Sequence, residues 1–575
     1  MSKKTINSNA SKQQSFLHGS AILVIAMALV KVIGAIYKIP LGELLDTAGM
    51  GYYSTAYDLY IPMYSIAMAG LPIAISRIVA EHMANGRYND VKRTLKIAQL
   101  AFVVTGGTGF ILMVLLAFLL TGNPFNVFHP GALPGIIAIA PCLLFCCIMS
   151  AYRGYYEGLR NMTPTAVSQV LEALGKLIFG YGIAFAVLKL TDDYSYAAAG
   201  AMLGITLGTV ASTGYLVVKY RKEKNTTFTS VELSSAPAAK TSSQTLKSLV
   251  MIAIPIVLGS LVNNVTSLID VAMVQRQLAN AIEKAPDFFQ TQYASLIASE
   301  VAKNSEFNWM ADLPNSLYGC HRGFAFSIYN LVPQITSVLG VSAIPILATA
   351  WTNNDKDEIK TGINTMIRTT ALIAVPAGCG MFALSERILG LLYSNPEVVT
   401  IAGPNLRILG ICAVFAGLNA PLVNMLQAIN KQTVPLRNIA IGAVLKIVIN
   451  FILVGTPEIN ILGVPIGTTV CYVYIFVSNF ICFVKYSGVF PDIFSTIIKP
   501  LISGVLCAVA AFSVNLGLEY FGISQSLSTV VAILAAVIVY VICLALLKTL
   551  VREDILTLPK GEKIAKLLEK LKLMR

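Results

Sequence analysis

Six basic side chains lie inside, or at the edge of, apolar runs of this sequence. They are Lys31, Lys38, Arg77, Lys176, Arg368 and Lys446. A cation near the middle of a bilayer costs roughly 3 kcal/mol on insertion scales, so one that is retained there normally faces a water-filled cavity, an acidic partner or a bound anion. These residues therefore predict a site that recognises an anionic group inside a membrane protein.

Two of these cations share one face of a helix. Lys38 follows Lys31 after seven residues, which is about two helical turns and about 10 Å of rise. Gly34 leaves room on that face between them. Two ammonium groups at this spacing suit a pyrophosphate with a neighbouring acidic group. For Lys38, which lies just before Pro40, the alternative is that its side chain extends to the outer interface.

The second apolar run carries a further cation and an acid. Glu81 lies one helical turn after Arg77. Arg77 could therefore form an ion pair with Glu81 at the inner surface, or it could contact the substrate, and the sequence leaves both roles open. Asp58 lies near the outer start of the same run. It is either an interfacial acid or a partner of Lys38, and the sequence leaves both choices open.

An internal repeat relates two more of the cations. Glu157–Pro164 runs on to Lys176, and Gln427–Pro435 runs on to Lys446, at an offset of about 270 residues. We therefore treat Lys176 and Lys446 as one position used twice. Each copy holds an even number of predicted spans, which makes the repeat a parallel duplication about an axis along the membrane normal.

Three side chains are candidate partners of the repeated lysines. Glu172 precedes Lys176 by one turn, and Asn450 follows Lys446 by one turn. Asp270 is the acid near the middle of the second copy. A pair of Asp270 with Lys446 would be either a structural ion pair or a protonation switch that couples transport to the proton gradient.

Composition predicts the elements that position these residues. Of the 575 residues, 56% are hydrophobic and 12% are charged, and the mean hydropathy of +0.71 excludes a soluble multidomain protein. Apolar runs of about 20 residues indicate helices and not barrel strands of about 10. We predict an all-α integral membrane protein of about fourteen transmembrane helices, near 17–38, 50–82, 95–120, 133–157, 165–188, 196–218, 248–275, 323–350, 362–384, 402–428, 435–454, 464–485, 497–518 and 526–548.

Charge sets the predicted orientation and domains. Most of the 42 Lys and Arg residues fall in connections that place both termini in the cytoplasm, and the first run is expected to be an uncleaved span. The predicted parts are a cytoplasmic N-terminal tail (1–16), an N-lobe of six spans (17–220), a cytoplasmic linker (221–247), a C-lobe of six spans (248–486) with an extracytoplasmic insertion (276–322), a C-terminal helix pair (487–550) and a basic amphipathic cytoplasmic tail (551–575).

Two of these parts have predicted roles outside the bundle. The insertion at 276–322 is long and mixed in charge, and we expect a partly helical cap. The tail after residue 550 alternates leucines and lysines at helical spacing, which is typical of a helix on an anionic inner leaflet. The ten cysteines show no metal-ligand spacing, so we expect no metal, no cofactor and no catalytic residue.

The chain resembles the multidrug/oligosaccharidyl-lipid/polysaccharide exporter superfamily, and within it the branch of MurJ-like lipid II flippases and stage V sporulation B proteins. The resemblance covers predicted spans 1 to 12. It rests on the order of five short segments, Lys31–Lys38, Gly49–Tyr53 leading to Asp58, Leu71–Ser76, Tyr156–Arg160 and Leu317–Gly319. The insertion at 276–322 departs from the family pattern.

The resemblance implies a flippase that turns a polyprenyl-pyrophosphate-linked cell-wall or polysaccharide precursor, similar to lipid II, to the outer leaflet by alternating access. It implies a cationic cavity in a bacterial plasma membrane, with the membrane potential or an H+ or Na+ gradient as driving force. Lys31 and Lys38 occupy places comparable to basic residues on the family's first helix. The family more often has arginines at these places. Because arginine binds a phosphate through two hydrogen bonds and lysine acts as a point charge, the resemblance implies a positive charge at Lys31 and Lys38 but not the same binding geometry.

Other functions fit the sequence less well. A drug or metabolite exporter of the same superfamily would want acids in its cavity to hold cationic substrates, whereas here cations prevail. A membrane glycosyltransferase or polymerase would need a cluster of catalytic acids or histidines. We therefore expect a transporter and no enzyme, whose partners are a lipid-linked oligosaccharide, anionic lipids and cell-wall synthesis enzymes, and no nucleic acid.

Overall fold

The computed structural model describes residues 16–68, 70–122, 127–342, 344–549 and 551. Within these ranges every regular element is a helix, so the predicted all-α membrane fold is confirmed. Eleven helices of the described residues are long and apolar enough to cross a membrane. The count of fourteen stays a prediction, and the predicted amphipathic tail lies almost entirely outside the described residues.

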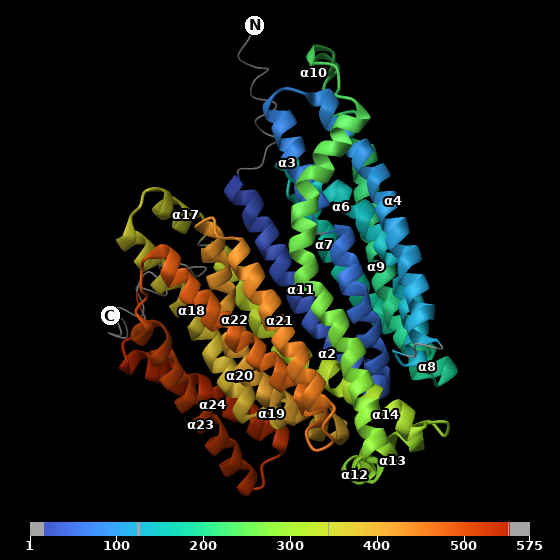
Figure 1. Cartoon of the computed structure of the whole chain (residues 1–575), viewed down its shortest axis with the longest axis vertical. Helices are drawn as coiled ribbons and strands as arrows, with labels where there is room; N and C mark the ends of the chain where they lie inside the picture. The colour runs from blue at the N-terminus through green and yellow to red at the C-terminus, as the bar shows by residue number, and fades with distance from the viewer. Residues whose placement is uncertain (1–15, 69, 123–126, 343, 550, 552–575) are drawn as a thin grey trace. The chain divides into compact units, whose positions relative to one another are not determined.

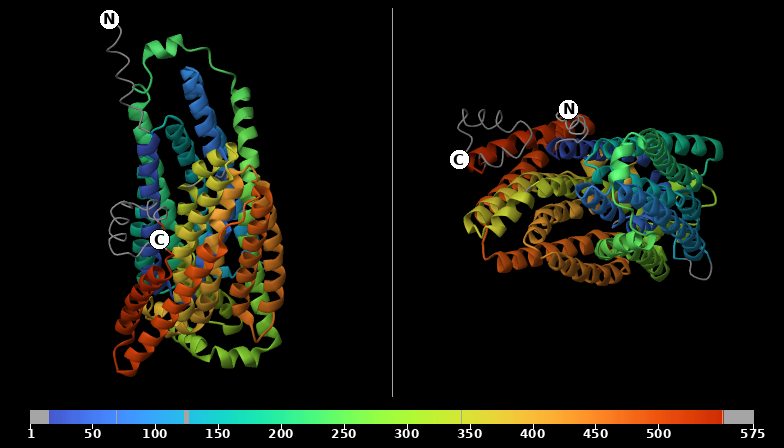
Figure 2. Two further views of the ribbon diagram at one scale, coloured as in Figure 1. Left: turned by 90° about the vertical axis from the view of Figure 1, so that its left-hand side faces the viewer. Right: turned by 90° about the horizontal axis from the view of Figure 1, so that it is seen from above.

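The chain divides into two compact units, Met1–Ala272 and Met273–Arg575. The helices of the first unit lie alongside one another (Figures 1 and 2). Its elements are α2 (Phe16–Met68), α3 (Leu71–Ala84), α4 (Tyr88–Thr121), η1 (Pro130–Ala132), α5 (Leu133–Ile139), α6 (Cys142–Gly158), α7 (Thr163–Gly175), η2 (Lys176–Gly180), α8 (Tyr181–Thr191), α9 (Tyr194–Glu223), α10 (Ser230–Ser235) and most of α11 (Ser242–Lys284).

Two predicted spans are joined in α2. Asp46 interrupts this helix with φ 54° and ψ −162°, a backbone conformation that side-chain-bearing residues seldom adopt. Its carboxylate accepts a hydrogen bond of 2.7 Å from the backbone N–H of Thr47. The second predicted span then continues from the end of α2 into α3, which has Pro72 in its first turn. The sequence did not reveal that the first connection is nearly as helical as the spans it joins.

The second unit is also helical throughout its described residues. Its elements are α12 (Pro286–Gln292), α13 (Ala294–Lys303), α14 (Trp309–Gly319), η3 (Cys320–Ala325), α15 (Phe326–Tyr329), α16 (Leu331–Ser342), α17 (Ile344–Thr352), α18 (Lys356–Ala383), α19 (Ser385–Leu392), α20 (Pro396–Ala428), α21 (Thr433–Val454), η4 (Asn460–Leu462), α22 (Gly463–Ser487), η5 (Phe494–Ile498), α23 (Lys499–Tyr520) and α24 (Gln525–Leu546). The segment predicted as an insertion holds α12, α13 and α14, so its partly helical character is confirmed.

The internal repeat is visible in how one helix ends in each unit. After α6, the N–H of Asn161 donates to the carbonyl of Tyr156 at 2.9 Å, and after α20 the N–H of Lys431 donates to the carbonyl of Leu426 at 2.8 Å. Arg160 and Asn430 occupy the same place in the two turns, with φ of 58° and 59°. Both turns close with the six-residue hydrogen bond of a Schellman motif.

A buried thiol repeats as well. The Cys142 thiol lies 3.3 Å from the hydroxyl of Tyr60, and the Cys412 thiol lies 3.4 Å from the hydroxyl of Tyr329. The two cysteines are also separated by 270 residues. The duplication that the sequence predicts therefore extends to side-chain contacts.

Candidate functional site: a tyrosine-lined cation site in the first unit

A ladder of tyrosines follows one face of α2. Tyr53, Tyr57, Tyr60 and Tyr64 are spaced by four, three and four residues, which places them on one side of a helix. Successive ring centroids are 6.0, 6.1 and 5.5 Å apart. We call these four residues the tyrosine ladder. The spacing was visible in the sequence, but sequence reasoning passed over these aromatic residues as ordinary span residues.

Lys176 lies against the ladder. Its ammonium nitrogen is 5.0 Å from the ring centroid of Tyr37 and 5.1 Å from that of Tyr57, both within the range of a cation–π interaction. Lys176 is also the first residue of η2, a single π-helical turn between α7 and α8. Such turns inside α-helices are frequent at functional sites. The predicted site residue is therefore held by two aromatic faces at an irregular turn.

Close backbone packing fixes the position of this turn. Gly200, Gly204 and Gly208 recur every four residues along α9. A Cβ atom on Gly208 would lie 2.9 Å from both the carbonyl oxygen of Glu172 and the backbone nitrogen of Lys176, and one on Gly204 would overlap the backbone of Gly180. Small residues at this spacing let membrane helices approach closely. The backbone of Lys176 is thus held by direct contact with α9.

This packing predicts a large difference between two glycines of α9. We expect Gly204→Ala to destabilise the fold by about 1–3 kcal/mol, because its Cβ meets backbone that cannot move aside. Gly214→Ala is the matched control, since a Cβ there meets nothing within 4 Å and alanine favours a helix by up to about 1 kcal/mol. Thermal unfolding of the purified protein in detergent checks this, and equal unfolding temperatures for the two variants would contradict the packing.

Lys38 extends the cationic surface along α2. Its ammonium nitrogen is 5.0 Å from the ring centroid of Tyr53, at the start of the tyrosine ladder. The hydroxyl groups of Tyr37 and Tyr53 are buried and interact with each other. Two cations and two buried hydroxyls therefore lie around the start of the ladder. This is a set of groups that suits an oxygen-rich anion.

The other predicted residues of the first unit are distributed differently. Asp58, which follows Tyr57 in the sequence, is buried, with 2% of its surface exposed. Lys31 is half-buried and lies about two helical turns before Lys38, on the same face of α2. Arg77 has an exposed side chain on α3. Lys38 and Lys176 lie against tyrosine rings of α2, and Asp58 interacts electrostatically with Tyr53. The binding roles of all five residues stay predictions.

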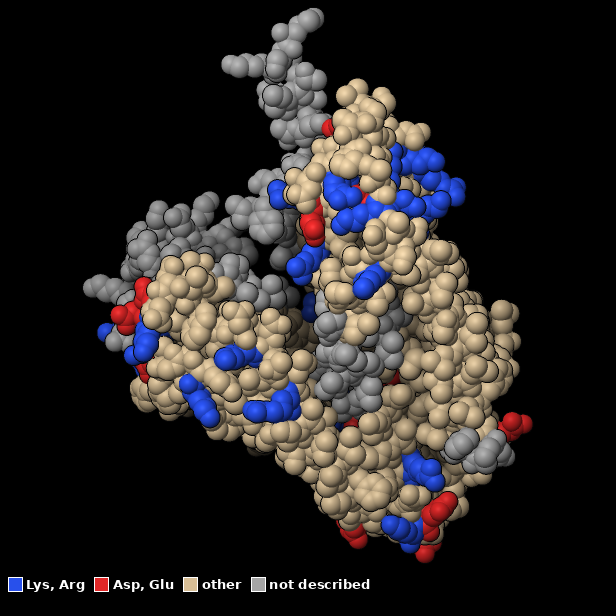
Figure 3. All heavy atoms as spheres, turned by 45° about the horizontal axis from the view of Figure 1, so that its top comes forward, with Lys and Arg blue, Asp and Glu red and all other residues tan. Residues whose placement is uncertain are grey.

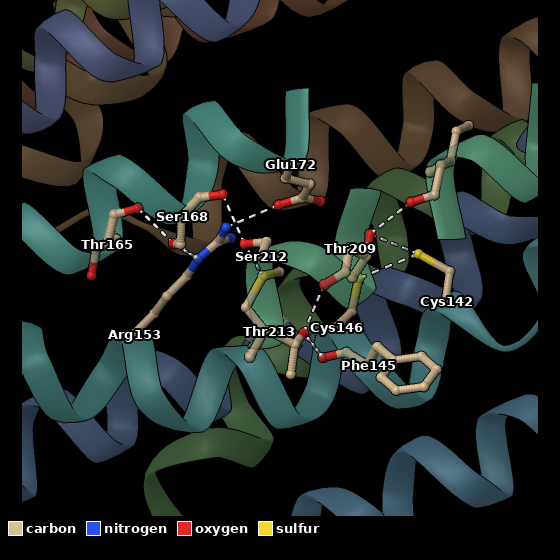
Figure 4. A network of polar contacts seen from close by, with 12 residues as sticks. Cys142, Phe145, Cys146, Arg153, Thr165, Ser168, Glu172, Thr209, Ser212 and Thr213 are labelled. Atoms are coloured by element: carbon tan, nitrogen blue, oxygen red, sulfur yellow. Dashed lines mark hydrogen bonds and ion pairs between the residues drawn. The ribbon is translucent and has the colours of Figure 1, made fainter. Parts of the chain in front are cut away.

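Glu172 forms its ion pair with a residue of another helix. The guanidinium of Arg153, on α6, donates to the carboxylate of Glu172 at 2.9 Å and to the hydroxyl of Ser168 at 2.8 Å (Figure 4). Ser212 of α9 donates to the carbonyl of Ser168 at 2.8 Å. The network ties α6, α7 and α9 together near Lys176. Sequence reasoning did not single out Arg153 and so missed this role.

In the second unit the equivalent position keeps one neighbour, because Lys446 interacts electrostatically with the Cys412 thiol as Lys176 does with the Cys142 thiol. Lys446 is half-buried on α21, and Asn450 is fully buried one turn further on. Asn438, Asn479 and Asn419 form a chain of buried amide hydrogen bonds, each 2.8 Å, across α21, α22 and α20. Asp270 belongs to the first unit and Lys446 to the second, so their pairing stays a prediction.

Comparison with known proteins identifies the fold. A family model described as polysaccharide biosynthesis protein matches residues 16–352, and a MatE model matches residues 322–452. Stage V sporulation protein B of Bacillus subtilis (strain 168) is 23% identical over 550 residues, which cover 95% of this chain and 98% of that protein. Lipid II flippase MurJ of the same organism is 23% identical over 486 residues, covering 82% and 83%.

Solved structures agree with the sequence relatives. Lipid II flippase MurJ in an inward closed conformation matches with a TM-score of 0.62 and 13% identity, over 92% of this chain and 98% of that chain. An inward-facing multidrug resistance transporter of the MATE family matches with a TM-score of 0.58 and 13% identity, over 79% and 98%. At 13% identity the structural similarity establishes the fold but does not identify the substrate.

Proposed function

This chain belongs to the polysaccharide biosynthesis protein family, in the MurJ-like and stage V sporulation protein B branch of its superfamily, and we propose that it is a flippase. Its substrate is a cell-wall or polysaccharide precursor linked to a polyprenyl pyrophosphate, similar to lipid II. The protein turns this lipid from the inner to the outer leaflet of a bacterial plasma membrane by alternating access. Both termini lie in the cytoplasm.

The observation that carries this proposal is Lys176, held between two tyrosine rings, with Lys38 against the ring of Tyr53 on the same helix face. A pyrophosphate is the most highly charged part of the proposed lipid, and it must leave water to cross the membrane. Ammonium groups that are already oriented by aromatic faces can replace part of its hydration. The tyrosine ladder continues from this point with hydroxyl groups and ring faces, which suit the hydroxyls and apolar faces of a sugar.

An exporter of cationic drugs is less compatible with this surface. Such a substrate would be repelled by Lys38 and Lys176, which occupy ring faces that a cation would otherwise use. A metal-dependent glycosyltransferase is not favoured either. The described residues hold no cluster of three or more His, Cys, Asp or Glu side chains placed to bind a metal ion.

The test is a leaflet assay in vesicles. The full chain is reconstituted with fluorescent lipid II in the inner leaflet, and a reagent confined to the outside modifies whatever lipid becomes exposed. We expect protein-containing vesicles to expose the lipid far faster than protein-free vesicles, and a membrane potential or an H+ or Na+ gradient to change the rate. Equal rates with and without the protein, under every gradient, would overturn the proposal for this lipid.

Replacing Lys31 should lower the flipping rate by a smaller factor, which the same assay can measure. We expect Lys31→Gln to slow flipping by about tenfold, which corresponds to about 1.4 kcal/mol, because its half-buried ammonium contributes attraction without the aromatic cage of Lys176. Lys284→Gln is the control, since Lys284 is an exposed cation at the end of α11. Wild-type rates for both variants would remove Lys31 from the proposed site.

A further inference from the structure

A pocket separate from the tyrosine ladder opens where α6 ends. Its volume is about 610 Å³, which is within the range of small-molecule sites. Its wall comes from the end of α3, the start of α4, the turn after α6, and the segment between α9 and α10. All of these elements belong to the first unit. The proposed topology places this end of the unit in the cytoplasm.

Arg160 lines this pocket in an unfavourable backbone conformation. Seven non-glycine residues of the described chain have positive φ, and five of them are Asp or Asn, the residues that tolerate this region best. Arg160 is one of the two exceptions, with φ 58°. In the second unit the same turn carries Asn430 with φ 59°. The repeat therefore shows that asparagine suits this turn, and that arginine is held here against backbone preference.

The side chain of Arg160 is available to a ligand. It is exposed, and with the described residues it makes no side-chain hydrogen bond or ion pair. An arginine retained at a strained position without a structural contact points to a function. Its planar fork is the side chain best suited to bind a phosphate group through two hydrogen bonds.

The acids of the pocket are already engaged. The carboxylate of Glu223 is paired with Lys219 at 2.8 Å and accepts a hydrogen bond from Tyr156 at 3.0 Å. Glu232 belongs to the capping box of α10, where it accepts from the N–H of Thr229 at 2.8 Å. Lys219 therefore neutralises Glu223, and the capping box fixes the carboxylate of Glu232 at the start of α10. The turn after α6 itself contributes one positive charge, that of Arg160.

The surroundings add positive charge and a flat aromatic surface. Tyr88 and Phe228 line the pocket with ring centroids 5.3 Å apart, and the ammonium of Lys92 lies 5.9 Å from the ring centroid of Phe228. Figure 3 shows Lys and Arg side chains gathered over the end of the molecule where α3, α4 and α10 meet. Aromatic faces beside a basic group suit a ring or an alkyl chain attached to a phosphate.

We propose that this pocket is a second binding site, which takes a phosphate-bearing ligand with its phosphate on Arg160. The phosphate belongs either to a soluble phosphomonoester such as a nucleotide or to the headgroup of an anionic phospholipid. Because α3 continues the span that carries the tyrosine ladder, and α9 packs against the turn of Lys176, the ligand binds where it can influence the transport site. The site is distinct from the one that holds the transported lipid.

The test measures binding to the full chain in nanodiscs. One arm titrates uridine monophosphate into nanodiscs of neutral phosphatidylcholine, and the other titrates a fluorescent short-chain phosphatidylglycerol. We expect saturable binding in one arm, which identifies the source of the phosphate, and a loss of at least tenfold in affinity for Arg160→Asn. Arg160→Asn should also unfold at the same or a higher temperature, because asparagine is accepted at Asn430.

Two further variants make the outcome decisive. Lys224→Asn removes an exposed cation of the same end of α9, and we expect it to change affinity by less than twofold. Arg160→Gly provides a second variant that tolerates positive φ, should the asparagine variant express poorly. Binding that is unchanged in both Arg160 variants, or no saturable binding of either probe by the wild type, overturns the proposal. A lower unfolding temperature for both Arg160 variants would assign Arg160 a structural role instead.

Discussion

Lys176→Gln is expected to slow lipid flipping by at least a hundredfold while the protein stays folded. The ammonium group lies between the rings of Tyr37 and Tyr57, where it is oriented before the pyrophosphate arrives. A hydrogen bond to a charged group contributes about 1.5–3 kcal/mol, and a hundredfold in rate is about 2.7 kcal/mol. The measurement is the initial rate of lipid exposure in vesicles, with the amount of reconstituted protein held equal.

Two other variants separate charge from structure at this position. Lys176→Arg keeps the charge but replaces a point charge with a wide fork, so we expect an intermediate rate. Lys189→Gln removes an exposed cation just after the same predicted span, near Phe185, and should leave the rate within twofold of wild type. Full activity of Lys176→Gln would refute the cation site.

Glu172→Leu is expected to have the largest effect on stability, about 3 kcal/mol. It would leave the guanidinium of Arg153 without its acidic partner, although that side chain is only 12% exposed, and an uncompensated buried charge is strongly destabilising. The double variant Arg153→Met with Glu172→Leu should recover most of the loss, since the pair is removed together. Chemical denaturation in detergent, arranged as a double-mutant cycle, gives the coupling energy.

An exposed ion pair supplies the control for this cycle. Arg407 and Glu386 are 3.0 Å apart with side chains 48% and 47% exposed, and such pairs contribute about 0–1 kcal/mol. Glu386→Leu should therefore change stability much less than Glu172→Leu. If the two variants cost the same, the network around Arg153 does not hold α6 and α7 together.

Sequence reasoning predicted the all-α membrane fold because long apolar runs carry a strong signal. It placed Lys176 in a span and linked it to Lys446 by the repeat, and the structure finds Lys176 in direct contact with two aromatic rings. It predicted a break between residues 38 and 50, and the structure has a break there, at Asp46. It did not show how short the break is, because the break is a backbone angle and not a residue type. The π-helical turn η2 was equally invisible, since the tight contact with α9 that accompanies it depends on a neighbouring helix.

Which side chains form ion pairs was harder to predict than where these side chains lie along the helices. Glu172 and Lys176 are four residues apart and interact electrostatically, as their spacing predicts, and Arg153 reaches Glu172 from a different helix as a second cation. Only the packing of α6 on α7 brings this second cation to Glu172. The glycines of α9 and the tyrosines of α2, by contrast, stood at regular spacing in the sequence. A search for small residues and aromatic residues along one face would have predicted both surfaces.

The repeat gives the most information where the two copies differ. Arg160 and Asn430 share one turn geometry, but only the first unit places a basic side chain there. Lys176 lies against two tyrosine rings in the first unit, and both Lys176 and Lys446 interact electrostatically with a cysteine at the matching position. The two units are thus expected to contribute different chemistry to transport.

The most direct test compares two lipids that differ by one phosphate. Polyprenyl pyrophosphate and polyprenyl monophosphate carriers of the same sugar are placed separately in vesicles with the full chain, and the rate of exposure to an external reagent is measured for each. Because the proposed site holds two ammonium groups, the pyrophosphate lipid should be exposed at least tenfold faster, and Lys176→Gln should remove that preference. Equal rates for both lipids, with the same ratio in the variant, would contradict recognition of the pyrophosphate by this site.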